Sequence, residues 1–210
     1  MREKCKRMRL AIVGDGGMSL VEVVIAISIL AVLSTASLGV YLSGMNSAAS
    51  LQRQQVAVTV ANEVMENVYA WPVSGLYTGR GRVAVQNLWA AGTGIGGVNE
   101  TYQAWDASAP VGSLGDVPVS NPTLIQRSGT TYKTQTFIGP CFQPVSGGDC
   151  LRARPLAATA PATPSGFTKL IRVIVVVRWD AGGSCGAGGC KYEAATIIDP
   201  NVDLLWNSNG

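Results

Sequence analysis

The chain contains no histidine, and this absence removes the commonest catalytic arrangements. Histidine is the usual general base, so neither a Ser-His-Asp nor a Cys-His arrangement can form. The acidic residues do not replace it, because they are scattered as single positions. Asp180, Asp199 and Asp203 could offer oxygen ligands to calcium, but their spacing is not that of an EF-hand, and surface charge is their expected role. We therefore expect no catalytic residues, no metal site and no cofactor in a protein that is not an enzyme.

A long stretch near the N-terminus lacks charge, and the same part of the chain lacks proline. No charged residue occurs in the thirty residues 23–52, and the first proline of the chain is Pro72. About 20 apolar residues are enough to span a bilayer, and residues 23–42 supply them. Because a residue before proline is biased out of the α-region, a single helix is predicted over residues 18–70.

This predicted helix has two different halves. The first half is apolar on every side, as expected for a segment that lipid or neighbouring helices bury. The second half, Leu51 to Tyr69, is amphipathic, and its apolar stripe should pack against a C-terminal head. The stripe consists of Ala57, Ala61, Val64, Met65 and Val68.

Three β-prone segments in the C-terminal third predict an antiparallel sheet. They are residues 131–138, 169–179 and 191–198, and we expect them to pair in this order. Residues 73–130 give little secondary-structure signal. The predicted fold is therefore α+β, with the long N-terminal helix packed on a C-terminal sheet of three or four strands.

One carboxylate, Glu22, lies at the edge of the uncharged stretch. An unpaired carboxylate at bilayer depth is costly, so it is a functional group whose partner must be found. The stretch itself contains no Lys, Arg or His. If the chain were cut between Gly17 and Met18, the new α-ammonium group of Met18 would lie about one helical turn from Glu22.

This arrangement resembles the class III signal of type IV pilins and of type II secretion pseudopilins, whose leader ends in Gly and whose fifth mature residue is Glu. The resemblance covers residues 17 to about 70. It implies that a prepilin peptidase cuts after Gly17 and that Met18 becomes the N-methylated N-terminus. It also implies that Glu22 pairs with this amine during assembly with other pilin or pseudopilin subunits, on an inner-membrane assembly platform.

Two other interpretations of the N-terminus stay open. An ordinary secretory signal could end at the small residues Ser34-Thr35-Ala36, although the apolar run continues past them. An uncut single-pass anchor is chemically permissible, but it leaves Glu22 without a role.

Charge is distributed unevenly between the two ends of the apolar stretch. Residues 1–17 contain five basic and two acidic residues, which favours a cytoplasmic leader and places the C-terminal head on the other side of the membrane. The resemblance implies that this membrane is the inner membrane and that the head is later part of an extracytoplasmic filament. The rest of the chain has eleven basic and eleven acidic residues, because the whole chain has sixteen and thirteen. This balance predicts no nucleic-acid partner. The basic pairs Arg80 with Arg82 and Arg152 with Arg154 are expected at the solvated surface.

The number of cysteines is typical of a domain that is exported from the cytoplasm. Cys5 lies in the leader, so processing would leave an even set of four, which suggests disulfides outside the membrane. Three pairings are possible, and we favour the two that close short loops, Cys141 to Cys150 and Cys185 to Cys190. A zinc site built from all four cysteines is the rival interpretation, but their spacing is not that of paired C-x2-C knuckles.

The resemblance divides the chain into four parts: a leader over residues 1–17, a membrane and filament-core helix over 18–50, an amphipathic half over 51–71, and a head over 72–210. Within the pilin-like proteins, residues 61–66 and 178–180 look like the minor pilins called type IV pilus modification proteins. The function predicted is therefore that of a minor pilin. A pseudopilin of a type II secretion system is the alternative, and a filament-tip adhesin is an alternative of another class.

Overall fold

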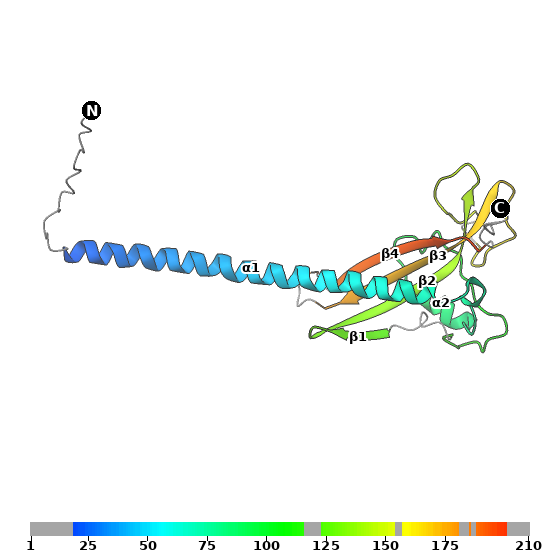
Figure 1. Cartoon of the computed structure of the whole chain (residues 1–210), viewed down its shortest axis with the longest axis horizontal. Coiled ribbons are helices and arrows are strands. Elements are labelled where there is room, and N and C mark those ends of the chain that lie inside the picture. Colours follow the sequence, from blue (N-terminus) through cyan, green and yellow to red (C-terminus); the bar gives the residue numbers. More distant parts are fainter. Residues whose placement is uncertain (1–18, 116–122, 154–156, 181–184, 186–187, 201–210) are drawn as a thin grey trace, which may run out of the picture. The chain divides into compact units, whose positions relative to one another are not determined.

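A computed structural model describes residues 19–115, 123–153, 157–180, 185 and 188–200 of the chain. The chain divides into two compact units, Met1–Ala48 and Ala49–Gly210. The first described helix, α1, runs from Leu20 to Tyr69 and crosses the boundary between these units (Figure 1). Its last backbone hydrogen bonds are donated by Ala70 and Trp71, so the helix ends before Pro72, as the sequence predicts.

The second unit contains a four-stranded antiparallel sheet in the order β1-β2-β3-β4. The strands are β1 (Thr123–Arg127), β2 (Thr130–Pro144), β3 (Phe167–Trp179) and β4 (Cys190–Ile198). The α+β prediction and the pairing order are confirmed. Strand β1 was not predicted, and β2 continues six residues beyond the predicted end at Ile138.

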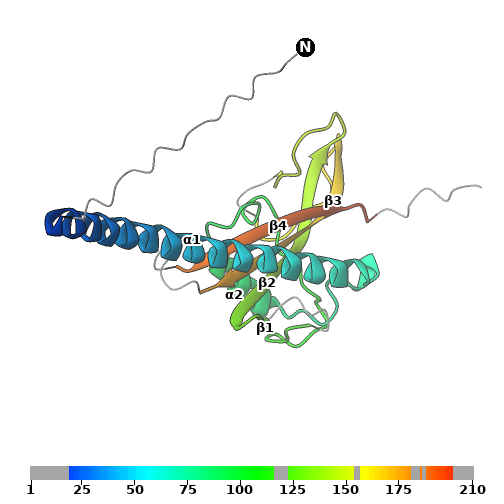
Figure 2. The ribbon, with the colours of Figure 1, turned by 60° about the vertical axis from the view of Figure 1, so that its left-hand side comes forward.

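The two faces of the sheet are covered by different helices (Figure 2). On one face, Ala57, Val60 and Ala61 of α1 pack in one hydrophobic cluster with Val175 and Val177 of β3. The predicted amphipathic stripe therefore packs on the sheet. Small side chains in α1 allow this close approach, because the branched side chains of β3 fill the space between helix and strand.

On the opposite face, a helix that the sequence did not reveal completes the core. This helix, α2 (Arg82–Ala91), contributes Leu88 and Trp89 to a cluster with Phe137, Ile174 and Val176. Alternate residues of β3 thus enter different clusters, and both sets are buried. This explains why β3 has a nearly continuous apolar sequence rather than an alternating one.

Arg80 contradicts the expectation of a solvated surface pair. Its side chain is completely buried, and its Nη1 donates a hydrogen bond of 3.2 Å to the carbonyl oxygen of Ile138. Burial lowers the pKa of Arg80 to about 10, so the guanidinium is still charged at neutral pH. Arg82 is exposed, as expected. The prediction failed for Arg80 because a loop bridge to Leu114 holds its backbone, and its side chain reaches β2 at Ile138.

We predict that Gly139→Ala destabilises the head by about 1–3 kcal/mol. A Cβ atom at Gly139 would collide with the carbonyl oxygen of Tyr102, where a loop crosses β2 and the Tyr102 amide donates to Pro140. The midpoint of thermal unfolding of the full chain in detergent should fall by several degrees. Gly112→Ala is the matched control, because a Cβ atom there has nothing within 4 Å. Equal midpoints for the two variants would contradict the prediction.

Candidate functional site

The candidate assembly site is the beginning of α1. The carbonyl oxygen of Ser19 accepts hydrogen bonds from the amides of Glu22, at 2.9 Å, and Val23, at 3.2 Å, and these bonds close the first turn. Glu22 lies in this turn and is exposed. A carboxylate is favoured there because unpaired amide groups give a helix N-terminus a partial positive charge. The ion pairs among the described residues, Arg127–Glu63 and Lys191–Glu193, do not include Glu22.

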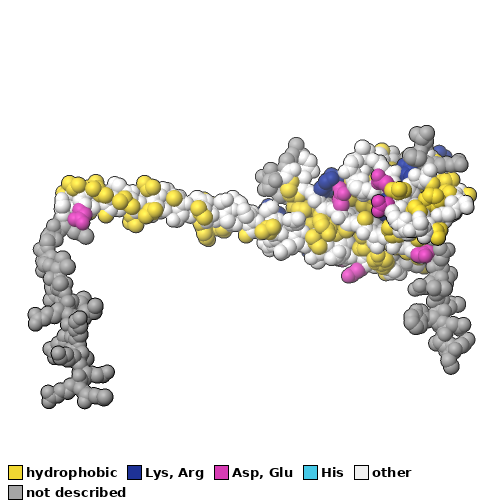
Figure 3. Space-filling view, turned by 90° about the horizontal axis from the view of Figure 1, so that it is seen from above, with side chains coloured by type: hydrophobic (Ala, Val, Ile, Leu, Met, Phe, Trp, Pro, Cys, Tyr) yellow, Lys and Arg dark blue, Asp and Glu magenta, His cyan; other side chains and the backbone are white. Residues whose placement is uncertain are grey.

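Most of the apolar surface of this helix segment is left uncovered by the part of the chain that the structure describes. Fifteen large hydrophobic side chains from Leu20 to Met45 are 40–80% exposed. Figure 3 shows hydrophobic side chains along this segment. Burial of one such side chain is worth roughly 1.5–3 kcal/mol, so the whole surface represents well over 10 kcal/mol that lipid or other subunits must recover. By length and composition, α1 is the one described helix that could cross a membrane.

The hydroxyl groups of the segment are adapted to an apolar environment. Five of them donate to backbone carbonyl oxygens three or four residues earlier in α1, at 2.7–3.0 Å: Ser28, Ser34, Thr35, Ser37 and Ser47. Because these donors are satisfied within the helix, the segment can enter lipid or a helix bundle without an unpaired hydroxyl group at these positions.

Gly39 and Gly44 are also located in this segment, and a Cβ atom at either would meet nothing within 4 Å. Nothing inside the chain therefore requires glycine there. Small residues allow close helix–helix approach in an apolar medium, which is consistent with packing against helices of other subunits.

Comparison with known families gives a direct match in this region. Residues 14–38 match the prokaryotic N-terminal methylation motif. The match includes Gly17, Met18 and Glu22, although Gly17 and Met18 lie outside the described residues. No curated protein and no solved structure matches the chain. The methylation motif and the long apolar helix are consistent with a type IV pilin-like protein, a group that includes the pseudopilins, and they indicate membrane anchoring.

The four cysteines of the second unit lie in the two short-loop pairs favoured from the sequence. Cys141 is joined to Cys150, with 5.4 Å between the Cα atoms, and Cys185 to Cys190, with 4.9 Å. The first pair is buried beside Leu170. Cys185 is exposed, and Cys190 is the first residue of β4, so this pair restrains the entry to that strand.

Arg172, which the sequence did not single out, connects three segments of the head. Its guanidinium donates to the carbonyl oxygen of Gly97 at 3.2 Å, to Thr101 Oγ1 at 3.5 Å, and to the carbonyl oxygen of Cys150. Burial lowers the pKa of Arg172, and the charges of Glu100 and Asp149 oppose this shift. The sequence analysis missed these contacts because residues 169–179 were recognised only as a strand. A strand pattern does not indicate which loops pack on the strand.

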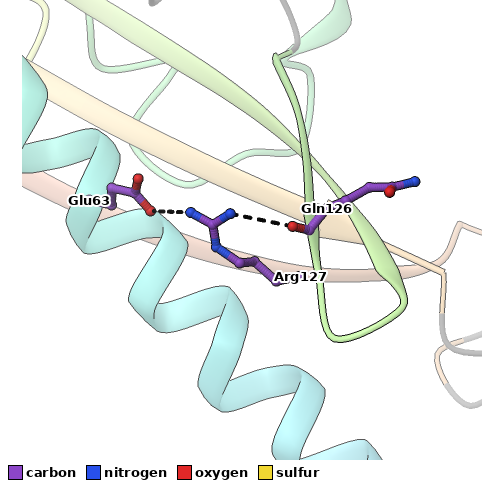
Figure 4. Close-up of polar contacts among 3 residues, drawn as sticks. All are labelled: Glu63, Gln126 and Arg127. Atoms are coloured by element: carbon purple, nitrogen blue, oxygen red, sulfur yellow. Dashed lines mark hydrogen bonds and ion pairs between the residues drawn. The ribbon is translucent and has the colours of Figure 1, made fainter.

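The second half of α1 is also linked to the edge of the sheet by charge. Arg127 Nη2 lies 3.5 Å from Glu63 Oε2, and Arg127 Nη1 donates to the carbonyl oxygen of Gln126 (Figure 4). Both charged side chains are about half exposed, so this ion pair contributes at most about 1 kcal/mol. It supports the orientation of α1 on the sheet without determining it.

We predict that peptide mapping recovers each disulfide within a single tryptic peptide. Cys141 and Cys150 both lie in residues 134–152, and Cys185 and Cys190 both lie in residues 179–191. After thiol blocking and digestion without reductant, each peptide should be unalkylated and two hydrogens lighter than its reduced form. Both alternative pairings would link the two peptides. Recovery of the linked species, or of alkylated peptides, would contradict the short-loop pairing.

Proposed function

We propose that this chain is a minor pilin, a structural subunit of a type IV pilus. In this proposal a prepilin peptidase removes residues 1–17 and leaves Met18 as an N-methylated N-terminus. Residues 18–50 form the membrane anchor and later the filament core. The amphipathic half, residues 51–71, joins this anchor to the head, residues 72–210, which faces outward from the inner membrane and then outward in the filament.

The observation that carries the proposal is the combination of Glu22 with an unburied apolar helix. The carboxylate lies in the first turn of α1, and the described residues leave most of the apolar helix surface beyond it exposed. A helix assembled among the helices of other pilin subunits would bury both. The positive charge at Met18 would then neutralise the carboxylate, and N-methylation would keep that charge. The methylation motif at residues 14–38 supports the same interpretation.

The choice of a pilus over a type II secretion filament rests on a sequence resemblance. Residues 61–66 and 178–180 resemble the type IV pilus modification proteins, and they lie in α1 and at the end of β3. Deletion of the gene should reduce surface pili and leave secretion of exported hydrolases unchanged. The opposite result would favour a pseudopilin.

We predict that processing depends on a small residue at Gly17. Intact mass of the membrane-extracted chain, expressed with and without a prepilin peptidase, should show an N-methyl-Met18 species only with the enzyme. Gly17→Ala should be processed, because the protease must accommodate a small side chain, whereas Gly17→Leu should stay full length. Efficient cleavage of Gly17→Leu, or an N-terminus near Ser37, would reject this processing site.

We also predict that Glu22→Ala is cleaved normally but enters filaments about tenfold less than wild type, or worse. The variant would leave the ammonium group of Met18 unpaired in an apolar environment, and breaking a buried ion pair costs several kcal/mol. The measurement is the amount of subunit in sheared filaments relative to the membrane fraction. Glu66→Ala is the matched control, since Glu66 is exposed on the same helix. Normal incorporation of Glu22→Ala would refute the pairing.

A further inference from the structure

The last strand of the sheet, β4, has one open edge (Figure 1). Within the described residues, its backbone pairs with β3 on one side and with no strand or bridge on the other. An open edge presents unpaired amide and carbonyl groups, and native proteins usually cover or shorten such an edge. At nine residues, β4 is not a short edge strand, whereas β1 at the opposite edge has five. The edge of β4 is therefore long enough to accept a further strand.

A depression of about 490 Å³ borders this edge on the α2 side of the sheet. Ile197 of β4 lines it and pairs in register with Arg172 of β3, which also lines it. Leu151, from the connection between β2 and β3, forms another part of the wall. Ile197 is 45% exposed and Leu151 is 46% exposed. Two large apolar side chains thus remain open to solvent in one hollow beside an open strand edge.

The polar side chains of the depression offer hydrogen-bond acceptors. Glu100 and Asp149 contribute carboxylates, and neither takes part in the ion pairs found among the described residues. The guanidinium of Arg172 already donates to two loop carbonyl oxygens and to Thr101. A group with an apolar body and one hydrogen-bond donor would therefore match this hollow. The indole ring of tryptophan has this combination.

The sequence that follows β4 is typical of a β-hairpin. Residues 201–210 lie outside the described residues, and they read N-V-D-L-L-W-N-S-N-G. Asp199 and Pro200 are favoured at the first two positions of a type I turn. Two-residue hairpin loops need a positive φ at their first residue, which proline cannot adopt, so a four-residue loop over 200–203 is favoured. The apolar run Leu204-Leu205-Trp206 comes directly after this loop.

The hairpin register assigns each side chain of this run to one face of the sheet. A four-residue loop gives three successive pairs: Asp199 with Leu204, Ile198 with Leu205, and Ile197 with Trp206. Directly paired residues of antiparallel strands point to the same face. Trp206 is therefore assigned to the depression beside Ile197. Leu205 is assigned to the α1 side beside Ile198, which is partly buried against the α1 cluster.

We propose that residues 204–206 add to the open edge of β4 as a fifth strand and that Trp206 fills the depression beside Ile197. The indole N–H then has the carboxylates of Glu100 and Asp149 as acceptors. Because the segment follows β4 directly, docking closes only a short loop and costs little chain entropy. The added strand covers the edge and so prevents heads from pairing edge to edge. This inference goes beyond the proposed function and does not depend on it.

Hydrogen–deuterium exchange of the full chain in detergent tests the docking. In the wild type, the amides of residues 193–198 that face the edge should be protected, because they donate to the added strand. Trp206→Ser should speed their exchange about tenfold and leave residues 171–177 of β3 unchanged. Asn209→Ser is the matched control, since it lies beyond the apolar run, and it should exchange like the wild type. Equal exchange of β4 in the wild type and Trp206→Ser would overturn the proposal.

Introduced cysteine pairs test the register while Trp206 stays in place. In a Cys5→Ser background, Leu205→Cys with Ile198→Cys puts two thiols at directly paired positions, whose Cα atoms are about 4.5–5.5 Å apart and suit a disulfide. Mild oxidation should join them. Leu205→Cys with Ala195→Cys is the control, because these positions are assigned to opposite faces. A disulfide in the control pair, or in neither pair, would overturn the assigned register.

Two further observations keep these results unambiguous. Recovery of both native disulfides by peptide mapping verifies that Trp206→Ser is folded, so faster exchange confined to β4 supports docking. Protection that rises with protein concentration would show that the segment adds to a neighbouring head, and docking within one chain would be wrong. Neither experiment involves cleavage after Gly17 or entry into filaments, so its failure would leave the proposed function intact.

Discussion

An apolar helical surface that the chain cannot bury by itself is the constraint on which the rest of this structure depends. From Leu20 to Met45 the helix presents large hydrophobic side chains, four of its hydroxyl groups donate to carbonyl oxygens of the same helix, and a Cβ atom at either glycine would meet nothing within 4 Å. Such a surface is stable only in lipid or among other helices. The second unit has to bury its own apolar side chains, and it also buries one face of the second half of α1.

The head meets this requirement through a strand that is buried on both faces. The odd residues of β3 from Ile171 to Trp179 contact the α1 side, and Ile174 and Val176 contact the α2 side. The small residues Ala57 and Ala61 let α1 lie close to β3, so the amphipathic half becomes part of the core rather than a tether. Arg172 and Arg178 of β3 lie on the α2 side of the sheet, near its two ends. Glu100 and Asp149 are close to Arg172, and Lys133 and Asp180 are close to Arg178.

The spacing of apolar residues along the sequence was enough to predict α1 and the three later strands. The length of α1, its stop before Pro72 and the order of the three later strands follow from local rules. Helix α2 was missed because it is only ten residues long and lies between Gly81 and Gly92, in a segment that gives little secondary-structure signal. Arg80 was placed at the surface because charge usually is solvated, whereas here the chain buries it and gives one nitrogen the carbonyl oxygen of Ile138. The loops that contact the sheet at Gly139 and at Arg172 are determined by tertiary contacts, which no local sequence pattern encodes.

The same distinction separates the two charged features of the molecule. Glu22 could be recognised from the sequence because its cost in an apolar environment is independent of the head's fold. The row of Lys133, Arg178 and Lys191 could not, since these residues are distant in the sequence and meet only through the strand register. A charge whose cost comes from an apolar helix can be identified from spacing along the chain, whereas charges on the sheet are brought together only by the fold.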